Sequence, residues 1–190
     1  MPPEKPTIFF ASQQDWEAWL EDNHADSPGV WIKMAKKASG VRSLNYKEAL
    51  EEALCFGWID GQAKSIDETY GLRMFTPRRS RSSWSQINVG HIERLTKEGR
   101  LRLAGQREVD AAKADGRWDN AYSSQSTIEV PNDFAKALEA QPDALTFFES
   151  LTKSARWPFL YRLTTIKRPE TRARRIAQYV ELLAEGKKLT

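Results

Sequence analysis

Two segments within residues 46–88 decide which fold this chain can adopt: Ala53-Leu-Cys-Phe-Gly-Trp-Ile-Asp-Gly61 and Phe75-Thr-Pro-Arg-Arg79. The first segment ends a stretch in which apolar residues recur at the spacing of one helix face, namely Tyr46, Ala49, Leu50, Ala53 and Leu54. Gly57 stands where a glycine in the left-handed conformation ends a helix. The spacing therefore predicts a helix over residues 46–56 that is deeply buried at its C-terminal end.

A pair of strands is predicted directly after this helix. Residues 58–66 and 70–75 have the alternating pattern of strands, and Asp67-Glu-Thr69 between them has the composition of a turn. Asp60-Gly61 is a competing turn, because Asp-Gly is typical of two-residue hairpin loops. We favour the longer hairpin, because a turn at Asp60 leaves too short a first strand.

The rest of the chain adds a further strand and several helices. Val30 to Lys36 alternates as a strand does, and Ser12-Gln-Gln-Asp15 is a capping box for a helix that ends near Asn23. Ser82-Ser83 can cap a helix that begins at Trp84. We therefore predict an α+β fold: a small antiparallel sheet of about three strands packed with helices over residues 1–124, and a helical domain over residues 125–190.

The composition indicates a globular protein with a highly charged surface. The chain has 190 residues, 11% aromatic residues and a net charge of +3, which is low for a uniformly basic nucleic-acid binder. The single cysteine allows no disulfide within the chain, and the N-terminus lacks an apolar signal segment. No apolar run reaches the ~18 residues of a membrane span. We therefore expect a cytoplasmic location and no membrane span.

The predicted hairpin offers a candidate ligand site. Because side chains alternate along a strand, Trp58 and Asp60 share a face, and Lys64 joins them if the strand has no bulge. Arg73 and Phe75 share a face of the next strand. If the two faces coincide, the aromatic rings could stack on a planar ligand while the cations hold an anionic group. The alternative is a structural salt bridge from Asp60 under packed aromatic side chains.

A basic loop after the second strand gives a second candidate site. Arg78, Arg79 and Arg81 precede the predicted helix start at Trp84. Guanidinium groups beside the amides of a helix N-terminus bind phosphate, carboxylate or a nucleic-acid backbone. The alternative is a solvated loop that pairs with the glutamate-rich helix. The candidate ligand-binding residues of the chain are therefore Trp58, Asp60, Lys64, Arg73, Phe75, Arg78, Arg79 and Trp84.

Recognised catalytic signatures are absent from the sequence. It contains no Gly-x-Gly-x-x-Gly, Walker A, Gly-x-Ser-x-Gly or His-Glu-x-x-His motif, and two histidines alone do not make a histidine-rich metal site. We therefore predict no catalytic residue, no metal and no cofactor. An alternative is an enzyme that uses Asp60 as acid or base, assisted by His91 or Arg73.

Several segments carry a family resemblance. They are Trp16-Glu-Ala-Trp-Leu20, Gly29-Val-Trp31, Tyr46 to Gly61, Phe75-Thr-Pro-Arg-Arg79, Trp84-Ser-Gln-Ile-Asn88, Asp115-Gly-Arg-Trp-Asp119 and Glu170-Thr-Arg-Ala-Arg-Arg-Ile176. With these segments the chain resembles the bacterial YdeI/OmpD-associated family over nearly its whole length. The resemblance implies a mixed α/β N-terminal part and a helical family domain from about residue 125. It also implies a link to resistance against antimicrobial peptides or bacteriocins. It carries over no catalytic residue.

We therefore expect a non-enzymatic cytoplasmic binding or stress-tolerance protein. Its partner would be a small anionic or aromatic ligand, held where the sheet meets the Arg78-Arg79 loop, or another protein. One alternative is nucleic-acid binding through the Arg78-Arg79-Arg81 loop, with Trp84 stacking on a base. The other alternative is the enzyme that uses Asp60.

Overall fold

The computed structural model describes residues 5–124 and 127–189. The chain forms two compact units, an N-terminal unit (Met1–Trp84 and Asn88–Ala121) and a C-terminal unit (Ser85–Ile87 and Tyr122–Thr190). The contacts change from one unit to the other between Ala121 and Tyr122, whereas the boundary predicted from sequence lies between residues 124 and 125. Residue 125 itself is outside the described part of the chain.

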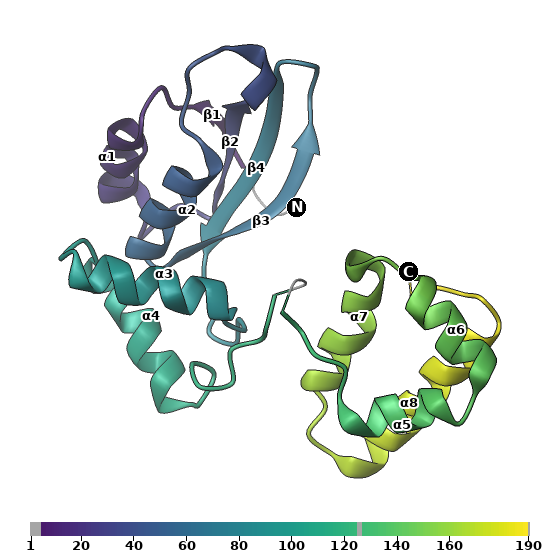
Figure 1. Cartoon of the computed structure of the whole chain (residues 1–190). Helices are drawn as coiled ribbons and strands as arrows, with labels where there is room; N and C mark the ends of the chain where they lie inside the picture. Colours follow the sequence, from purple (N-terminus) through teal and green to yellow (C-terminus); the bar gives the residue numbers. More distant parts are fainter. Residues whose placement is uncertain (1–4, 125–126, 190) are drawn as a thin grey trace. The chain divides into compact units, whose positions relative to one another are not determined.

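The N-terminal unit is built around a mixed sheet (Figure 1). Within residues 5–124 and 127–189 the sheet has four strands in the order β1-β2-β4-β3. Strand β1 is parallel to β2, and the other neighbours are antiparallel. The strands are β1 (Thr7–Phe9), β2 (Val30–Ala35), β3 (Trp58–Ser65) and β4 (Tyr70–Pro77). The α+β class is confirmed, and the sheet has one strand more than the sequence predicted, because the short apolar run before Phe10 pairs with β2.

The hairpin of β3 and β4 turns at residues 66–69, as predicted, and not at Asp60-Gly61. The Asp67 carboxylate accepts hydrogen bonds from the backbone amides of Thr69 and Tyr70, both at 2.7 Å, and these bonds lower the pKa of Asp67. The register shifts between Asp60 and Ala63, so Gly61 belongs to a β-bulge. The bulge places Lys64 on the opposite face of the sheet from Asp60.

One face of the sheet, the inner face, carries the core of the N-terminal unit. Helices α1 (Gln13–Asn23) and α2 (Tyr46–Cys55) lie against it (Figure 1). The rings of Trp58 and Phe75 pack around Trp16, with centroid distances of 6.2 and 5.8 Å. The Trp16 indole N–H donates to Ala49 O and the Trp58 indole N–H to His24 O, both at 3.1 Å. These rings are therefore buried with their polar groups satisfied.

Helix starts and ends follow local chemistry. Ser12 caps α1 through a capping box with Asp15, as predicted. Asn45 and Glu48 form the same motif at the start of α2, and Gly57 after that helix has a φ of 73°. The prediction for α3 was wrong by two residues, because α3 (Gln86–Lys97) begins after Trp84.

Two buried carboxylates join the helices of the N-terminal unit. Glu51 and Glu52 of α2 are 6% and 3% exposed. Glu51 forms an ion pair with Arg94 of α3 at 2.6 Å, and Glu52 pairs with Arg100, which precedes α4 (Leu103–Ala114). Since a buried carboxylate is stable only when it is paired, these contacts fix the position of α3 and Arg100 against α2.

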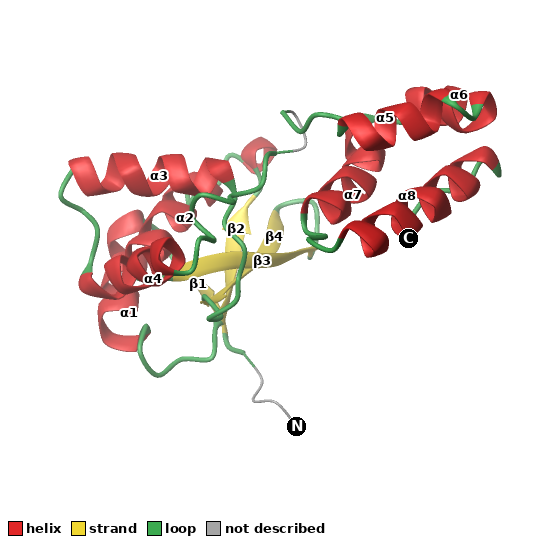
Figure 2. Ribbon diagram, turned by 90° about the horizontal axis from the view of Figure 1, so that it is seen from below, coloured by secondary structure: helices red, strands yellow, loops and turns green. Residues whose placement is uncertain are grey.

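The regular elements of the C-terminal unit in the described residues are helices, as predicted (Figure 2), apart from an isolated β-bridge between Ser85 and Tyr122. Aromatic rings fill its core, with Phe134 against Phe148 at 5.6 Å and Phe159 against Tyr179 at 5.2 Å between centroids. Arg172 clamps Asp133 through two hydrogen bonds of 2.5 and 2.9 Å. The helices are α5 (Asn132–Glu139), α6 (Pro142–Ser150), α7 (Lys153–Thr164) and α8 (Pro169–Ala184).

Helix α4 packs so closely on the end of α2 that Gly105 tolerates no side chain. A Cβ atom at Gly105 would lie 2.3 Å from Cys55 O and 2.8 Å from Leu54 O. We predict that Gly105→Ala lowers the free energy of unfolding by about 2 kcal/mol or more, because the backbones must separate. Gly90→Ala in α3 is the matched control, since no atom lies within 4 Å of its Cβ position.

Gly90→Ala should raise the free energy of unfolding by about 0.5–1 kcal/mol, because alanine is the better helix former. Urea denaturation monitored by tryptophan fluorescence measures both variants. Equal effects of the two substitutions would contradict the close contact between α2 and α4.

Candidate functional site

The structure divides the predicted site residues between the core and the surface. Trp58, Phe75 and Trp84 are each 1% exposed or less. Their rings are covered by other side chains of the N-terminal unit, so they do not form a solvent-facing platform. Burial of this kind depends on which helices cover the sheet, and strand periodicity alone does not reveal it.

Asp60 and Arg73 come together as the hairpin pattern predicted. Arg73 Nη1 lies 3.7 Å from Asp60 Oδ2, and both side chains are partly exposed. Tyr46, the first residue of α2, donates its hydroxyl hydrogen to Asp60 at 2.9 Å, and the Arg73 guanidinium lies 4.7 Å from the centre of the Tyr46 ring. Tyr46 was predicted only as a helix residue, so its part in this cluster was missed.

Lys64 does not join this cluster, because the bulge between Asp60 and Ala63 reverses its direction. It pairs in register with Leu72, and its ammonium group lies 4.5 Å from the centre of the Trp31 ring on the other face of the sheet. The condition attached to its prediction, a strand without a bulge, is not met.

The arginine loop is partly a structural element. Arg78 is 7% exposed, stacks on the Trp84 ring at 3.7 Å, and donates to Ser83 O at 2.8 Å. Arg79 and Arg81 are exposed. Ser82 accepts a hydrogen bond from the Arg79 amide and does not cap α3. A phosphate backbone at this loop would therefore meet two exposed guanidinium groups instead of three.

Of the residues of the alternative catalytic site, Arg73 lies beside Asp60, whereas His91 lies in another cluster. His91 Nδ1 is 3.8 Å from Glu51 Oε1, whereas Asp60 contacts Tyr46 and Arg73. In residues 5–124 and 127–189 no group of three or more His, Cys, Asp or Glu side chains is arranged to hold a metal ion.

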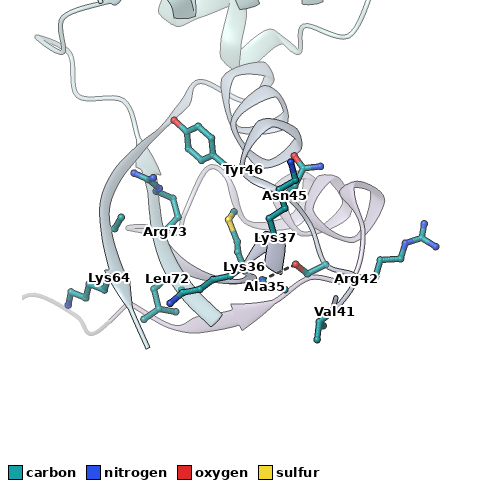
Figure 3. Close-up of a pocket in the computed structure, with 14 residues that line it drawn as sticks. Ala35, Lys36, Lys37, Val41, Arg42, Asn45, Tyr46, Lys64, Leu72 and Arg73 are labelled. Carbon is teal, nitrogen blue, oxygen red and sulfur yellow. Dashed lines mark hydrogen bonds between the residues drawn. The ribbon is translucent and has the colours of Figure 1, made fainter. Parts of the chain in front are cut away.

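A pocket of about 660 Å³ lies where the sheet meets the N-terminus of α2 (Figure 3). The strand side carries Arg73, Lys64 and Leu72, and the loop side carries Val41 and Arg42. The complete lining is Met34, Ala35, Lys36, Lys37, Val41, Arg42, Ser43, Asn45, Tyr46, Ala63, Lys64, Gly71, Leu72 and Arg73. Five of these residues are cationic, and none is Asp, Glu, His or Cys.

The cations of the pocket differ in their partners. Lys36 Nζ donates to Ser65 Oγ at 3.0 Å and to Asp67 O at 2.6 Å, and Arg73 donates to Gly61 O at 3.3 Å. Lys37 and Arg42 make no ion pair or side-chain hydrogen bond with any residue that the structure describes. These two cations are free to bind an anion from solution.

The loop that carries these two cations has a defined shape. A 3-10 turn (Lys37–Ser39) ends at Gly40, which has a φ of 70°, and Ser43 Oγ accepts a hydrogen bond from the Ala35 amide at 2.9 Å. The sequence did not predict a site in this loop, because the loop has no regular period. The available signal was a lysine pair between a strand and the N-terminus of a helix.

Two neighbouring arginines should respond differently to substitution. We predict that Arg78→Ala lowers the free energy of unfolding by about 2 kcal/mol, because it removes a desolvated cation–π contact and a hydrogen bond. Arg79→Ala, the adjacent exposed arginine, should change it by less than about 0.5 kcal/mol. Chemical denaturation measures both values. Equal stability of the two variants would show that Arg78 is not a structural residue.

Cys55 should be inert in the folded protein. Burial, and then the charge of Glu52, raise the pKa of the Cys55 thiol to about 12. At about pH 8 the thiolate is therefore rare, and the side chain is fully buried. We predict no reaction with a disulfide reagent until the protein is unfolded. A Cys55→Ser/Ser80→Cys variant, with its thiol on an exposed loop, is the control and should react at once; rapid labelling of native Cys55 would contradict the burial.

Comparisons with known proteins divide the chain into two parts that are similar to the two compact units of the structure. Residues 8–108 match the model of a domain of unknown function, DUF8412, and residues 127–186 match the family described as Bacteriocin-protection, YdeI or OmpD-Associated. No curated protein and no solved structure matches the chain.

The resemblance predicted from sequence is thus supported for the C-terminal unit, whereas the motifs quoted between Trp16 and Asn88 fall within the DUF8412 match. No helix in the described part of the chain is long and apolar enough to cross a membrane. Because the first match covers more than half of the chain, the protein belongs to the DUF8412 family, and its C-terminal segment matches the YdeI/OmpD-associated family.

Proposed function

We propose that this protein binds a small anionic ligand in the pocket between the sheet and the N-terminus of α2. One observation carries the proposal: five cationic residues and no carboxylate line the pocket, and four of them, Lys36, Lys37, Arg42 and Arg73, are not drawn to the other face of the sheet as the Lys64 ammonium group is. Like charges gathered around a concave surface raise the local electrostatic potential and attract an anion. Binding an anion would relieve the repulsion between these side chains.

The free cations indicate where the charged group of the ligand lies. Lys37 and Arg42 have no partner among the described residues, so binding breaks no existing ion pair. A guanidinium group matches the geometry of carboxylate and phosphate oxygens. The charged group therefore lies on the loop side of the pocket, beside Lys37 and Arg42.

Apolar surface near the cations supports a ligand with an apolar or planar body. Tyr46 and Val41 are 42% and 41% exposed, and Leu72 and Met34 also line the pocket. The Tyr46 hydroxyl is held by Asp60 and its ring by Arg73, so the ring is oriented before a ligand arrives. Pre-orientation of this kind reduces the entropy cost of binding.

Binding without catalysis fits the chemistry of the pocket best. The lining offers no histidine, cysteine or carboxylate as a base or nucleophile, and Ser43 Oγ is engaged by the Ala35 amide. Asp60, at the edge, accepts a hydrogen bond from Tyr46 and lies near Arg73. These contacts engage the Asp60 carboxylate in a structural role.

The cellular role follows as part of the same proposal. The description of the C-terminal family, bacteriocin protection, supports a role in stress tolerance. A single buried cysteine without a disulfide is consistent with a reducing, cytoplasmic location. We propose that the ligand-binding N-terminal unit serves that role together with the C-terminal unit.

The pocket can be tested with two matched pairs of substitutions. Inorganic phosphate, citrate, benzoate and a nucleoside monophosphate are titrated by calorimetry against the wild type, Lys37→Gln/Arg42→Gln and the control Lys97→Gln/Arg107→Gln. The control removes the same charges from exposed sites outside the pocket. We expect the pocket variant to weaken binding of at least one anion about tenfold, or about 1.4 kcal/mol, and the control to leave it unchanged.

Tyr46→Ala should weaken benzoate more than phosphate, because only benzoate has a ring for Tyr46 to contact. The proposal would be contradicted if the wild type bound none of these anions, or if the pocket and control variants lost affinity equally.

A further inference from the structure

The face of the sheet opposite α1 and α2, which we call the outer face, shares Lys64 and Leu72 with the lining of the pocket, whereas its aromatic side chains and Lys33 do not line the pocket. In the register of the sheet, Trp31 pairs with Met74 of β4. Lys33 pairs with Leu72 of β4 on one side and with Phe9 of β1 on the other. On the inner face Val30, Ile32 and Phe75 are completely buried, whereas none of the paired outer side chains is. Phe9 is 44% exposed. The outer face is therefore only partly covered, with its other paired side chains half-buried.

Aromatic rings and lysines alternate across this face. Lys33 Nζ lies 4.0 Å from the centre of the Tyr70 ring, and Lys64 Nζ lies 4.5 Å from the centre of the Trp31 ring. Phe9 contacts the Tyr70 ring edge-on at 6.4 Å between centroids. Each lysine thus rests on a ring, and neither forms an ion pair within 4 Å with a carboxylate of the residues that the structure describes. An incoming anion can draw the ammonium group off the ring and leave the ring free to stack.

The strands themselves present only positive charge on this face, and the described carboxylate that acts electrostatically on Lys33, Asp67, belongs to the turn between β3 and β4. Asp60 is the only carboxylate within the four strands, and its pairing with Phe75 turns it to the inner face. Lys33 and Lys64 are therefore the charged groups that the strands present on the outer face. A second copy of the same face would bring like charges together, which disfavours self-association through it.

We propose that the outer face binds single-stranded nucleic acid, with bases stacked on Trp31 and Tyr70 and phosphates held by Lys33 and Lys64. Single strands are recognised by this combination of accessible aromatic rings and cations on a sheet. Stacking between base pairs in a duplex hides the ring faces that Trp31 would contact. The surface differs from the Arg78-Arg79-Arg81 loop, in which Arg78 is already occupied by Trp84.

The experiment uses substitutions that separate this surface from the pocket and from the arginine loop. Trp31 and Lys33 do not line the pocket, whereas Lys64 does, so the test variants are Trp31→Ala and Lys33→Gln. Arg79→Gln/Arg81→Gln is the control. Fluorescence anisotropy follows binding of the full chain to labelled oligo(U) and oligo(dT) of about 12 nucleotides, and to a duplex of equal length, between about 50 and 200 mM salt.

We expect Trp31→Ala to weaken binding of both single strands about tenfold, because a stacking platform is lost. Lys33→Gln should reduce the slope of log affinity against log salt by about 0.7, the contribution of one phosphate contact. The control should change neither quantity by a comparable amount, and the duplex should bind more weakly than the single strands.

Three outcomes would overturn the proposal. They are absence of binding at the lowest salt, binding that Trp31→Ala and Lys33→Gln leave intact, and loss of binding only in Arg79→Gln/Arg81→Gln. Circular dichroism shows whether Trp31→Ala is folded. Lys33→Gln changes an outward-facing side chain, so its salt slope decides the question even if Trp31→Ala is unstable.

Discussion

The N-terminal unit depends on the burial of two adjacent carboxylates. Glu51 and Glu52 lie on the covered side of α2, where an unpaired charge would be too costly to keep. Arg94 and Arg100 supply the opposite charges from α3 and from the segment before α4. Hydrophobic packing alone would allow α3 to slide along α2, whereas ion pairs at fixed positions define one register. The charges thus specify how the helices dock on one another.

The ion pairs of Glu51 and Glu52 hold only the C-terminal half of α2, and the candidate pocket lies at the N-terminal end of that helix. The C-terminal half of α2 is held by the ion pairs and by the close approach of Gly105 to the carbonyl of Cys55. The N-terminal end, with Asn45 and Tyr46, is exposed above the sheet. Because the buried half fixes the direction of the helix, the exposed end can form one wall of a pocket without being packed itself.

Local patterns predicted the elements well and the exposure of their side chains less well. The helix before Gly57, the hairpin turn at Asp67 and the helical C-terminal unit follow from period, turn chemistry and caps. Arg78 could not be recognised as buried, because its partner Trp84 reaches it only through the folded loop. The pocket loop around Lys37 has no period, so its cations were not among the candidate residues predicted from the sequence.

The β-bulge at Gly61 turns the side chains before and after it to different faces of the sheet. Without it, strict alternation would place Asp60 and Lys64 on the same face, where they could form an ion pair. The register shift instead leaves Asp60 inside, where it orients Tyr46, and sends Lys64 outward to Trp31. The carboxylate is thereby kept away from both the free cations of the pocket loop and the lysines of the outer face. An acidic group among those cations would neutralise them, so the position of the bulge supports the anion binding that we propose for both surfaces.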